Sequence, residues 1–218
     1  MPSVTDAGRR TPRRDAAENR ESLLVAAVAV LSASPDASLE AIAAAAGLSR
    51  RALYGHFANR DELIAALIER GAERLVAAAS ATDADDARVA IALLGARLWD
   101  AVEHVRLLAG VALRAPYVER AADALAPVRE QLAAFIRRGV ADGTVREDIR
   151  PDVLARLVEE SAIAVLAEAS RHDLPDAEGR RLVMLAVLGT AGLSWREAGA
   201  LVAATPELAT THPHTEDS

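Results

Sequence analysis

Hydrophobic residues recur along this chain at intervals of three and four positions, with polar and charged residues between them. This spacing is typical of helices that bury one face, and alternating polar and apolar runs extend over only a few residues. The pattern therefore predicts an all-α protein, with a kink at Pro127. The expected helices are 15–32, two short ones within 38–57, one beginning near 59, one after 86, and then 105–113, 117–140, 152–171 and 177–193.

The segment from Ser38 to Phe57 predicts two short helices joined by a tight turn. Ser38 and Ser49 each precede a helical segment and are suited to cap it. Gly47 lies between the two segments and can adopt the positive φ that ends a helix sharply. Ala43 stands where the helices would cross, so its small side chain allows close approach. These features together predict a helix-turn-helix.

The second short helix has an outward face that core packing does not explain. This face carries Arg50, Arg51, Tyr54 and His56. An arginine can donate two hydrogen bonds to guanine N7 and O6, or bind phosphate, so we expect at least one of the two arginines to contact a base. Ala52 can contact a thymine methyl group. The alternative is a plain helical hairpin whose outer face is merely solvated.

One continuous motif carries these features: Ile42-Ala43-x-x-Ala46-Gly47-Leu48-Ser49-x-x-x-Leu53-Tyr54-x-His56-Phe57-x-x-Arg60-x-x-Leu63. This motif resembles the DNA-binding signature of the TetR family of bacterial repressors. There are two departures from the family pattern. Arg60 stands where the family commonly has Lys, and Gly55 leaves a gap where many members carry a larger side chain, so the base preference is open.

Several polar residues around the motif are expected to bind phosphate. Tyr54 and His56 place donors at the edge of the recognition helix, and the family pattern points the same way. Ser38 is expected to hold a phosphate at the start of its helix and Arg60 to grip one from the start of the next helix. Ser49, which begins the recognition helix, completes this expected DNA-binding set.

The charge of the chain is unevenly distributed. The net charge is −7, but residues 1–60 carry eight Arg against six acidic residues, whereas residues 61–218 carry seventeen against twenty-six. A polyanion would therefore approach the N-terminal end. The densest basic cluster is an N-terminal arm with Arg9, Arg10, Arg13 and Arg14, which can contact phosphate or the minor groove. The alternative is a disordered tail that only aids solubility.

The last two long helices are the expected partner surface. The 177–193 helix is apolar nearly all round, and one domain of this size covers only part of such a helix. A four-helix interface in a homodimer would cover the rest, and a two-fold dimer would match a palindromic site. The alternative is a central helix within a monomer. The expected interface residues are Leu154, Leu157, Val158, Val165, Leu182, Leu185, Leu188, Gly189 and Gly192.

The family resemblance implies a ligand pocket in the helical body. The candidate lining residues are the large or polar ones of the middle helices: Trp99, Glu103, His104, Tyr117 and Phe135. Each of them has a plainer interpretation as a core, surface or helix-end residue. The chain has only six aromatic residues, so we expect a mostly aliphatic pocket for a small hydrophobic molecule.

Enzyme function is disfavoured by the residues present. There is no Glu-x-x-His pair for a metal in a helical bundle, and His104 and His172 are the only histidines available in the body. We therefore expect no catalytic residues, no metal and no cofactor. The chain has no Cys, no signal-peptide pattern and no apolar stretch long enough to span a membrane, so we expect a cytoplasmic protein without membrane contact.

The sequence as a whole predicts a ligand-responsive, sequence-specific DNA-binding regulator. We expect a repressor that a small hydrophobic molecule releases from a palindromic operator in double-stranded DNA. The alternative is a helical adaptor or dimerisation protein without specific DNA binding. The expected organisation is a basic flexible arm (1–14), a helix-turn-helix DNA-binding domain (15–60), a connecting helix (61–80), a helical ligand-binding and dimerisation domain (81–204) and a disordered tail (205–218).

Overall fold

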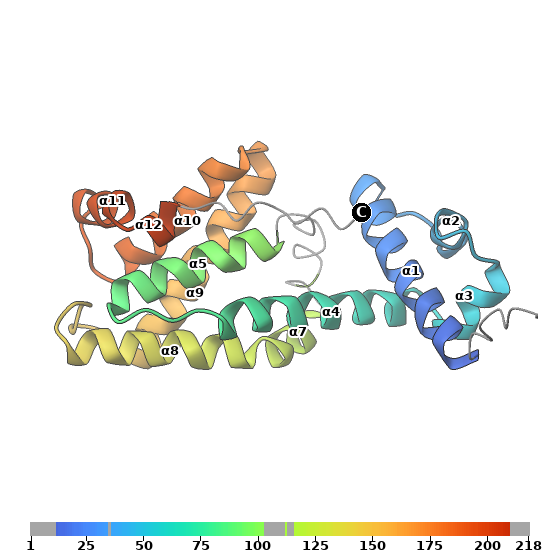
Figure 1. Ribbon diagram of the computed structural model, residues 1–218, viewed down its shortest axis with the longest axis horizontal. Helices are drawn as coiled ribbons and strands as arrows, with labels where there is room; N and C mark the ends of the chain where they lie inside the picture. The colour runs from blue at the N-terminus through green and yellow to red at the C-terminus, as the bar shows by residue number, and fades with distance from the viewer. Residues whose placement is uncertain (1–11, 35, 103–111, 113–115, 210–218) are drawn as a thin grey trace, which may run out of the picture. The chain divides into compact units, whose positions relative to one another are not determined.

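The computed structural model describes residues 12–34, 36–102, 112 and 116–209, and within them all regular structure is helical (Figure 1). The chain divides into two compact units, Met1–Leu67 and Ile68–Ser218. One helix, α4 (Arg60–Ser80), contributes its first residues to the first unit and the remainder to the second. The expected all-α fold is therefore confirmed.

The first unit is built from α1 (Pro12–Ala33), α2 (Leu39–Ala45), α3 (Arg50–His56) and the start of α4. Each helix turns an apolar face inward, because burying these side chains provides most of the favourable free energy of a small helical domain. Its largest fully buried side chains are Leu23, Leu24, Ile42, Leu53, Phe57 and Leu63.

The turn between α2 and α3 has the expected geometry. Gly47 has φ +67°, and Leu48 N donates to Ala43 O over 2.9 Å. Ala43 is buried between the helices. The backbone reversal needs a residue that tolerates positive φ, which glycine does at little cost. The prediction of a helix-turn-helix is confirmed in these details.

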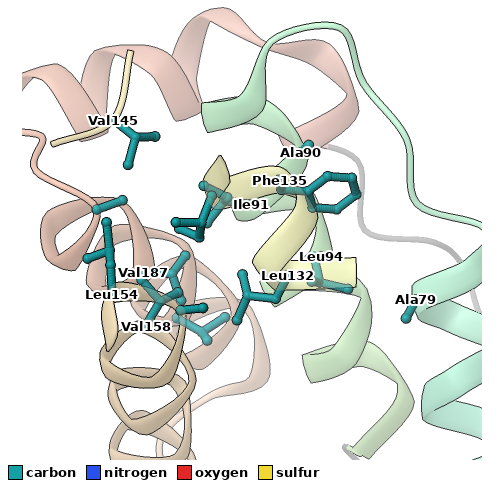
Figure 2. Close-up of a cluster of buried hydrophobic side chains, with 14 of the residues drawn as sticks. Ala79, Ala90, Ile91, Leu94, Leu132, Phe135, Val145, Leu154, Val158 and Val187 are labelled. Carbon is teal, nitrogen blue, oxygen red and sulfur yellow. The ribbon is translucent and has the colours of Figure 1, made fainter. Parts of the chain in front are cut away.

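The second unit is a helical bundle in which α5 (Ala87–Val102) packs against α10 (Asp176–Thr190) and α8 (Ala126–Ala141). Helix α9 (Pro151–His172) packs against both α8 and α10. Aliphatic side chains from these helices meet in one buried cluster (Figure 2). Helix α5 therefore packs against both α8 and α10.

The 117–140 segment differs from its predicted form. It forms two helices, α7 (Val118–Ala124) and α8, instead of one kinked helix. Pro127 lies in the first turn of α8, where its missing N–H would have no intrahelical partner in any case. The expected 105–113 helix falls outside the described residues, apart from Ala112.

The C-terminal end is more ordered than predicted. Helix α11 (Trp195–Ala204) is followed by α12 (Pro206–Ala209), so the expected disordered tail from residue 205 is wrong for residues 205–209. Leu208 is buried against α11 and neighbouring helices, which explains why this short segment is held. The Ser194-x-x-Glu197 capping box begins α11, and this pattern in the sequence would have predicted the helix. Residues 210–218 lie outside the described residues.

The N-terminal arm also begins differently from the prediction. Helix α1 starts at Pro12, so residues 12–14 are helical and do not belong to a flexible arm. The side chains of Arg13 and Arg14, like residues 1–11 with Arg9 and Arg10, lie outside the described part of the structure. Among the described residues, every helix is too short or too polar to cross a membrane.

Candidate nucleic-acid interface and ligand cavity

Helix α3 presents a polar face because its apolar side chains are fixed in the core. Leu53 is fully buried, as is Phe57 at its C-terminal end. Arg50, Arg51 and Tyr54 are exposed on the other side of the helix. Two arginines and a tyrosine on two helical turns form a surface suited to base edges and phosphates.

The two predicted capping serines are observed as caps. The Ser38 hydroxyl accepts a hydrogen bond from Ala41 N over 3.2 Å, and the Ser49 hydroxyl accepts one from Ala52 N over 3.1 Å. Each serine therefore fixes where its helix begins. A serine hydroxyl that accepts a hydrogen bond can also donate one, which is compatible with the expected phosphate contact of Ser49.

Glu40 on α2 also belongs to this surface, although it was not predicted from the sequence. Its Oε1 atom lies 3.0 Å from Arg50 Nη2 and accepts a 3.4 Å hydrogen bond from the Tyr54 hydroxyl. The Arg50 guanidinium also lies 5.4 Å from the centre of the Tyr54 ring. Backbone hydrogen bonding, together with Arg50, Ser38 and Tyr54, holds the pKa of Glu40 below its usual value. An ionised carboxylate therefore orients two side chains of the recognition helix.

The other expected DNA-binding residues occupy the edges of this surface. Ala52 and His56 are half-buried. The His56 ring centre lies 6.5 Å from that of Phe57. Arg60 donates through Nη1 to the carbonyl of Ala37, so it connects the start of α4 to the residue before Ser38. This contact gives Arg60 a structural role that the sequence did not reveal.

The second unit contains a cavity of about 420 Å³. Trp99 lies in its wall, as expected, and most of the remaining wall is aliphatic. Phe135 is instead buried in the core cluster of Figure 2, and neither it nor Tyr117 lines the cavity. Glu103 and His104 lie outside the described residues. The wall also contains four charged residues that were not predicted from the sequence: Arg129, Arg156, Glu159 and Glu160.

Trp99 is held in place from two sides. Its Nε1 donates to Asp176 Oδ1 over 2.6 Å. Its ring packs so closely on α10 that a Cβ atom at Gly179 would lie 2.1 Å from Cζ2. The glycine is therefore required for this approach, because real Cβ contacts are never that short. The sequence offered no sign of this contact, since the two residues are far apart in the chain.

A second polar connection joins the same two helices. Arg180 on α10 is buried, and its Nε lies 3.0 Å from Asp100 Oδ1 on α5. Its Nη1 donates to the Leu208 carbonyl on α12 over 2.8 Å. One buried guanidinium thus links three helices, as buried charges usually require several partners.

The expected interface residues separate into two groups. Leu154, Val158, Val165 and Leu188 are buried within the subunit, so for them the interpretation as a subunit interface is wrong. Gly192 has φ +113° and lies in the turn after α10, close to Arg146. The residues that face outward are Leu157 on α9 and Leu182, Leu185 and Gly189 on α10, with Leu185 half-buried.

Residues 23–67 match the family described as bacterial regulatory proteins, tetR family. This match covers α2, α3 and the buried positions that support them. No curated protein matches the chain significantly in sequence. The fold and the polar face of α3 define a helix-turn-helix transcriptional regulator that binds DNA. Over residues 23–67 the chain is similar to the DNA-binding domain of the TetR family.

Solved structures share most of the fold at low sequence identity. PfmR, a TetR family transcriptional regulator from Thermus thermophilus, is 22% identical with a TM-score of 0.63, over 76% of this chain and 96% of PfmR. FadR from Bacillus subtilis, in complex with stearoyl-CoA, is 15% identical with a TM-score of 0.64, over 80% of this chain and 99% of FadR. LfrR from Mycobacterium smegmatis, a TetR-like regulator in complex with proflavine, is 22% identical with a TM-score of 0.59, over 84% of this chain and 98% of LfrR.

Proposed function

We propose that the protein is a homodimeric repressor that binds a palindromic operator and is released from it by a small, mostly hydrophobic molecule. The outward face of α3 carries this proposal, because Arg50, Arg51 and Tyr54 are exposed on a helix whose other face is buried. Arg51 is the candidate for base contact, since Glu40 already engages Arg50 and Tyr54. Tyr54 and His56 are the candidates for phosphate contact.

An exposed apolar surface on α9 and α10 supports a dimer. Leu157 is 43% exposed and Leu182 37% exposed, and α9 and α10 pack against each other. Val153 adds to the apolar surface on α9. Apolar side chains exposed on two helices that pack together are candidates for a subunit interface. A two-fold dimer through this surface would present two α3 helices to two half-sites.

The cavity supports control by a ligand. Its wall is mostly aliphatic, and it includes Leu75 on α4, the helix that contributes to both units. A molecule that displaces Leu75 would therefore act on the helix that begins next to α3. FadR and LfrR are bound to small molecules in their solved structures, which is consistent with such a role.

The experiment that tests this function is selection of genomic DNA fragments by the purified protein, followed by sequencing. We expect enrichment of a short palindrome. The variant R50A/R51A should lose that enrichment, whereas R74A/R137A, which removes two exposed arginines from the second unit, should keep it. Retention of all fragments without a palindrome, or equal behaviour of the two variants, would contradict the proposal.

A further inference from the structure

The charged residues of the cavity wall are confined to two neighbouring helices. Arg129 comes from α8, and Arg156, Glu159 and Glu160 come from α9. Most other wall positions are apolar, and the indole N–H of Trp99 already donates to Asp176. A ligand in this cavity therefore meets its charged contacts in one region, and its remaining surface meets hydrocarbon.

The four charged residues form an asymmetric chain of ion pairs. Arg129 Nε lies 2.8 Å from Glu159 Oε1, and Arg156 Nη1 lies 3.6 Å from Glu159 Oε2. Arg156 Nη2 also lies 3.2 Å from Glu160 Oε1. Glu159 thus has two arginine partners, whereas Glu159 is the only acidic partner of Arg129 among the described residues.

This asymmetry decides which charge a ligand head group should carry. A ligand carboxylate that takes the place of Glu159 on Arg129 leaves Glu159 paired with Arg156, so no charge loses its last partner. A cationic head group that takes the place of Arg129 on Glu159 would leave Arg129 without its carboxylate. Because Arg129 is only 31% exposed, losing its partner would be costly.

We propose that the cavity binds an amphipathic monocarboxylate of the fatty-acid type, with its carboxylate on Arg129 and its hydrocarbon chain along the aliphatic wall. This inference rests on the proposed function, since it names the chemical class of the effector. Arginine is suited to the head group because its planar guanidinium binds a carboxylate through two parallel hydrogen bonds. The volume of about 420 Å³ falls within the range of small-molecule sites.

Trp99 provides a direct readout of binding. The chain has two tryptophans, and Trp195 is 73% exposed on α11. In a W195F background, Trp99 becomes the only source of tryptophan fluorescence, and it lies in the cavity wall. Titration with dodecanoate, dodecan-1-ol and dodecylammonium compares three head groups on the same hydrocarbon chain. The two charged ligands are kept below their micelle concentrations and the alcohol below its solubility limit. Decanoate, which is two methylene groups shorter than dodecanoate, then tests the contribution of the ligand's hydrocarbon chain.

We expect dodecanoate to bind at least about tenfold more tightly than the alcohol or the ammonium, since a charge-assisted contact adds to the same apolar burial. Each methylene should change the affinity about fourfold. R129Q should abolish the preference for dodecanoate, and E159Q should strengthen dodecanoate binding because Arg129 loses its competing partner. R137Q is the matched control on α8, because Arg137 is exposed and does not line the cavity.

The test is decisive because R129Q and E159Q are expected to change the affinity for dodecanoate in opposite directions. Weaker dodecanoate binding by E159Q, tightest binding of dodecylammonium, or no binding of dodecanoate would overturn the proposal. If R129Q fails to fold, the order of affinities for the three ligands and the effect of E159Q on dodecanoate binding still test the proposal. Operator binding is measured separately on the ligand-free protein: loss of dodecanoate binding with an intact operator complex refutes only the ligand class. Dodecanoate binding without operator release supports the ligand class and refutes induction.

Discussion

Glu40 and Arg50 form an ion pair across the helix-turn-helix, with 3.0 Å between Oε1 and Nη2. The pair joins α2 to the first residue of α3, on the surface that we expect to face DNA. Both side chains are largely exposed, at 43% and 69%, so the pair adds little to folding stability. Its main effect is to orient Arg50 before DNA arrives, and it places a negative charge where a polyanion would bind.

Glu40→Gln tests this effect. The substitution removes a negative charge from the interface and releases Arg50 and Tyr54 from a shared partner. We expect affinity for unrelated DNA to rise severalfold, because phosphate attraction is independent of sequence. The ratio between operator and unrelated DNA should fall. Fluorescence anisotropy at two salt concentrations measures both quantities.

Glu73→Gln is the control for Glu40→Gln. Glu73 is an exposed acidic residue on α4 in the second unit, so its substitution changes the net charge equally. It should leave the operator preference unchanged. If both variants behave alike, the effect of Glu40 is one of net charge alone, and its positioning role is wrong.

Tyr54→Ala and Arg51→Ala should affect DNA binding in different ways. Tyr54 is expected to contact phosphate, so its loss should weaken binding to all sequences. Arg51 is expected to contact bases, so its loss should cost about 1–3 kcal/mol at particular operator positions and relax the preference there. Binding to a panel of single-base operator variants measures the difference. A uniform loss of affinity in both variants would contradict this division of roles.

The helix-turn-helix was predictable because its determinants are local. Ser38, Ser49 and Gly47 act on residues within a few positions of themselves, through capping and a single left-handed turn. The order of the helices followed from their hydrophobic spacing for the same reason. The break between α7 and α8 was not predicted, because Pro127 is compatible with either a kink within one helix or the first turn of a new one. Tertiary packing decides between the two.

The cavity wall was not predictable, because its determinants are distant in sequence. Arg129 meets Glu159 across 30 positions and Arg180 meets Asp100 across 80. Hydrophobic spacing predicts that all four of these residues lie on helices, but it does not predict which helices pack against each other. The same reason explains Phe135, whose size and region suggested a pocket residue, whereas packing places it in the core.

Charged substitutions at Leu157 and Leu182 should separate the subunits. The two leucines are exposed in the single chain, so L157E/L182E should fold with unchanged helix content. Burying the new carboxylates in an interface would be unfavourable, so we expect a monomer in sedimentation velocity and a loss of operator affinity of at least about tenfold. Val25→Glu, at an exposed apolar position on α1, should leave the oligomeric state unchanged. A dimeric double variant would place the interface elsewhere.

Gly179→Ala should disturb Trp99. In an exposed helix interior, replacing Gly with Ala stabilises by about 1 kcal/mol. At Gly179 the new methyl group would lie 2.1 Å from the indole ring, so we expect a net loss of about 1–3 kcal/mol, as is typical of overpacking. Gly199→Ala on α11 meets no atom within 4 Å and should be neutral or stabilising. Denaturant unfolding compares the two, and Trp99 fluorescence in W195F shows whether the ring has moved.

Arg180→Met should destabilise the second unit more than most single substitutions. Arg180 has only 6% of its side chain exposed and pairs with Asp100, which is 23% exposed. Removing one member of a buried pair typically costs about 3–5 kcal/mol, because the other charge stays buried. Asp100 retains some contact with solvent, so we expect a value near the lower end of that range. The hydrogen bond to the Leu208 carbonyl is lost as well, so backbone amides of α12 should exchange faster with solvent.

A double-mutant cycle with Asp100→Ala separates the ion pair from the connection to α12. If the pair dominates, R180M/D100A should be less destabilised than the sum of the single variants, because the uncompensated carboxylate is gone. The amides of α12 should still exchange quickly in the double variant, since the guanidinium that donates to Leu208 is absent. Additive free energies of unfolding would mean that Arg180 stabilises the unit mainly through packing and the Leu208 carbonyl, and that its pairing with Asp100 contributes little.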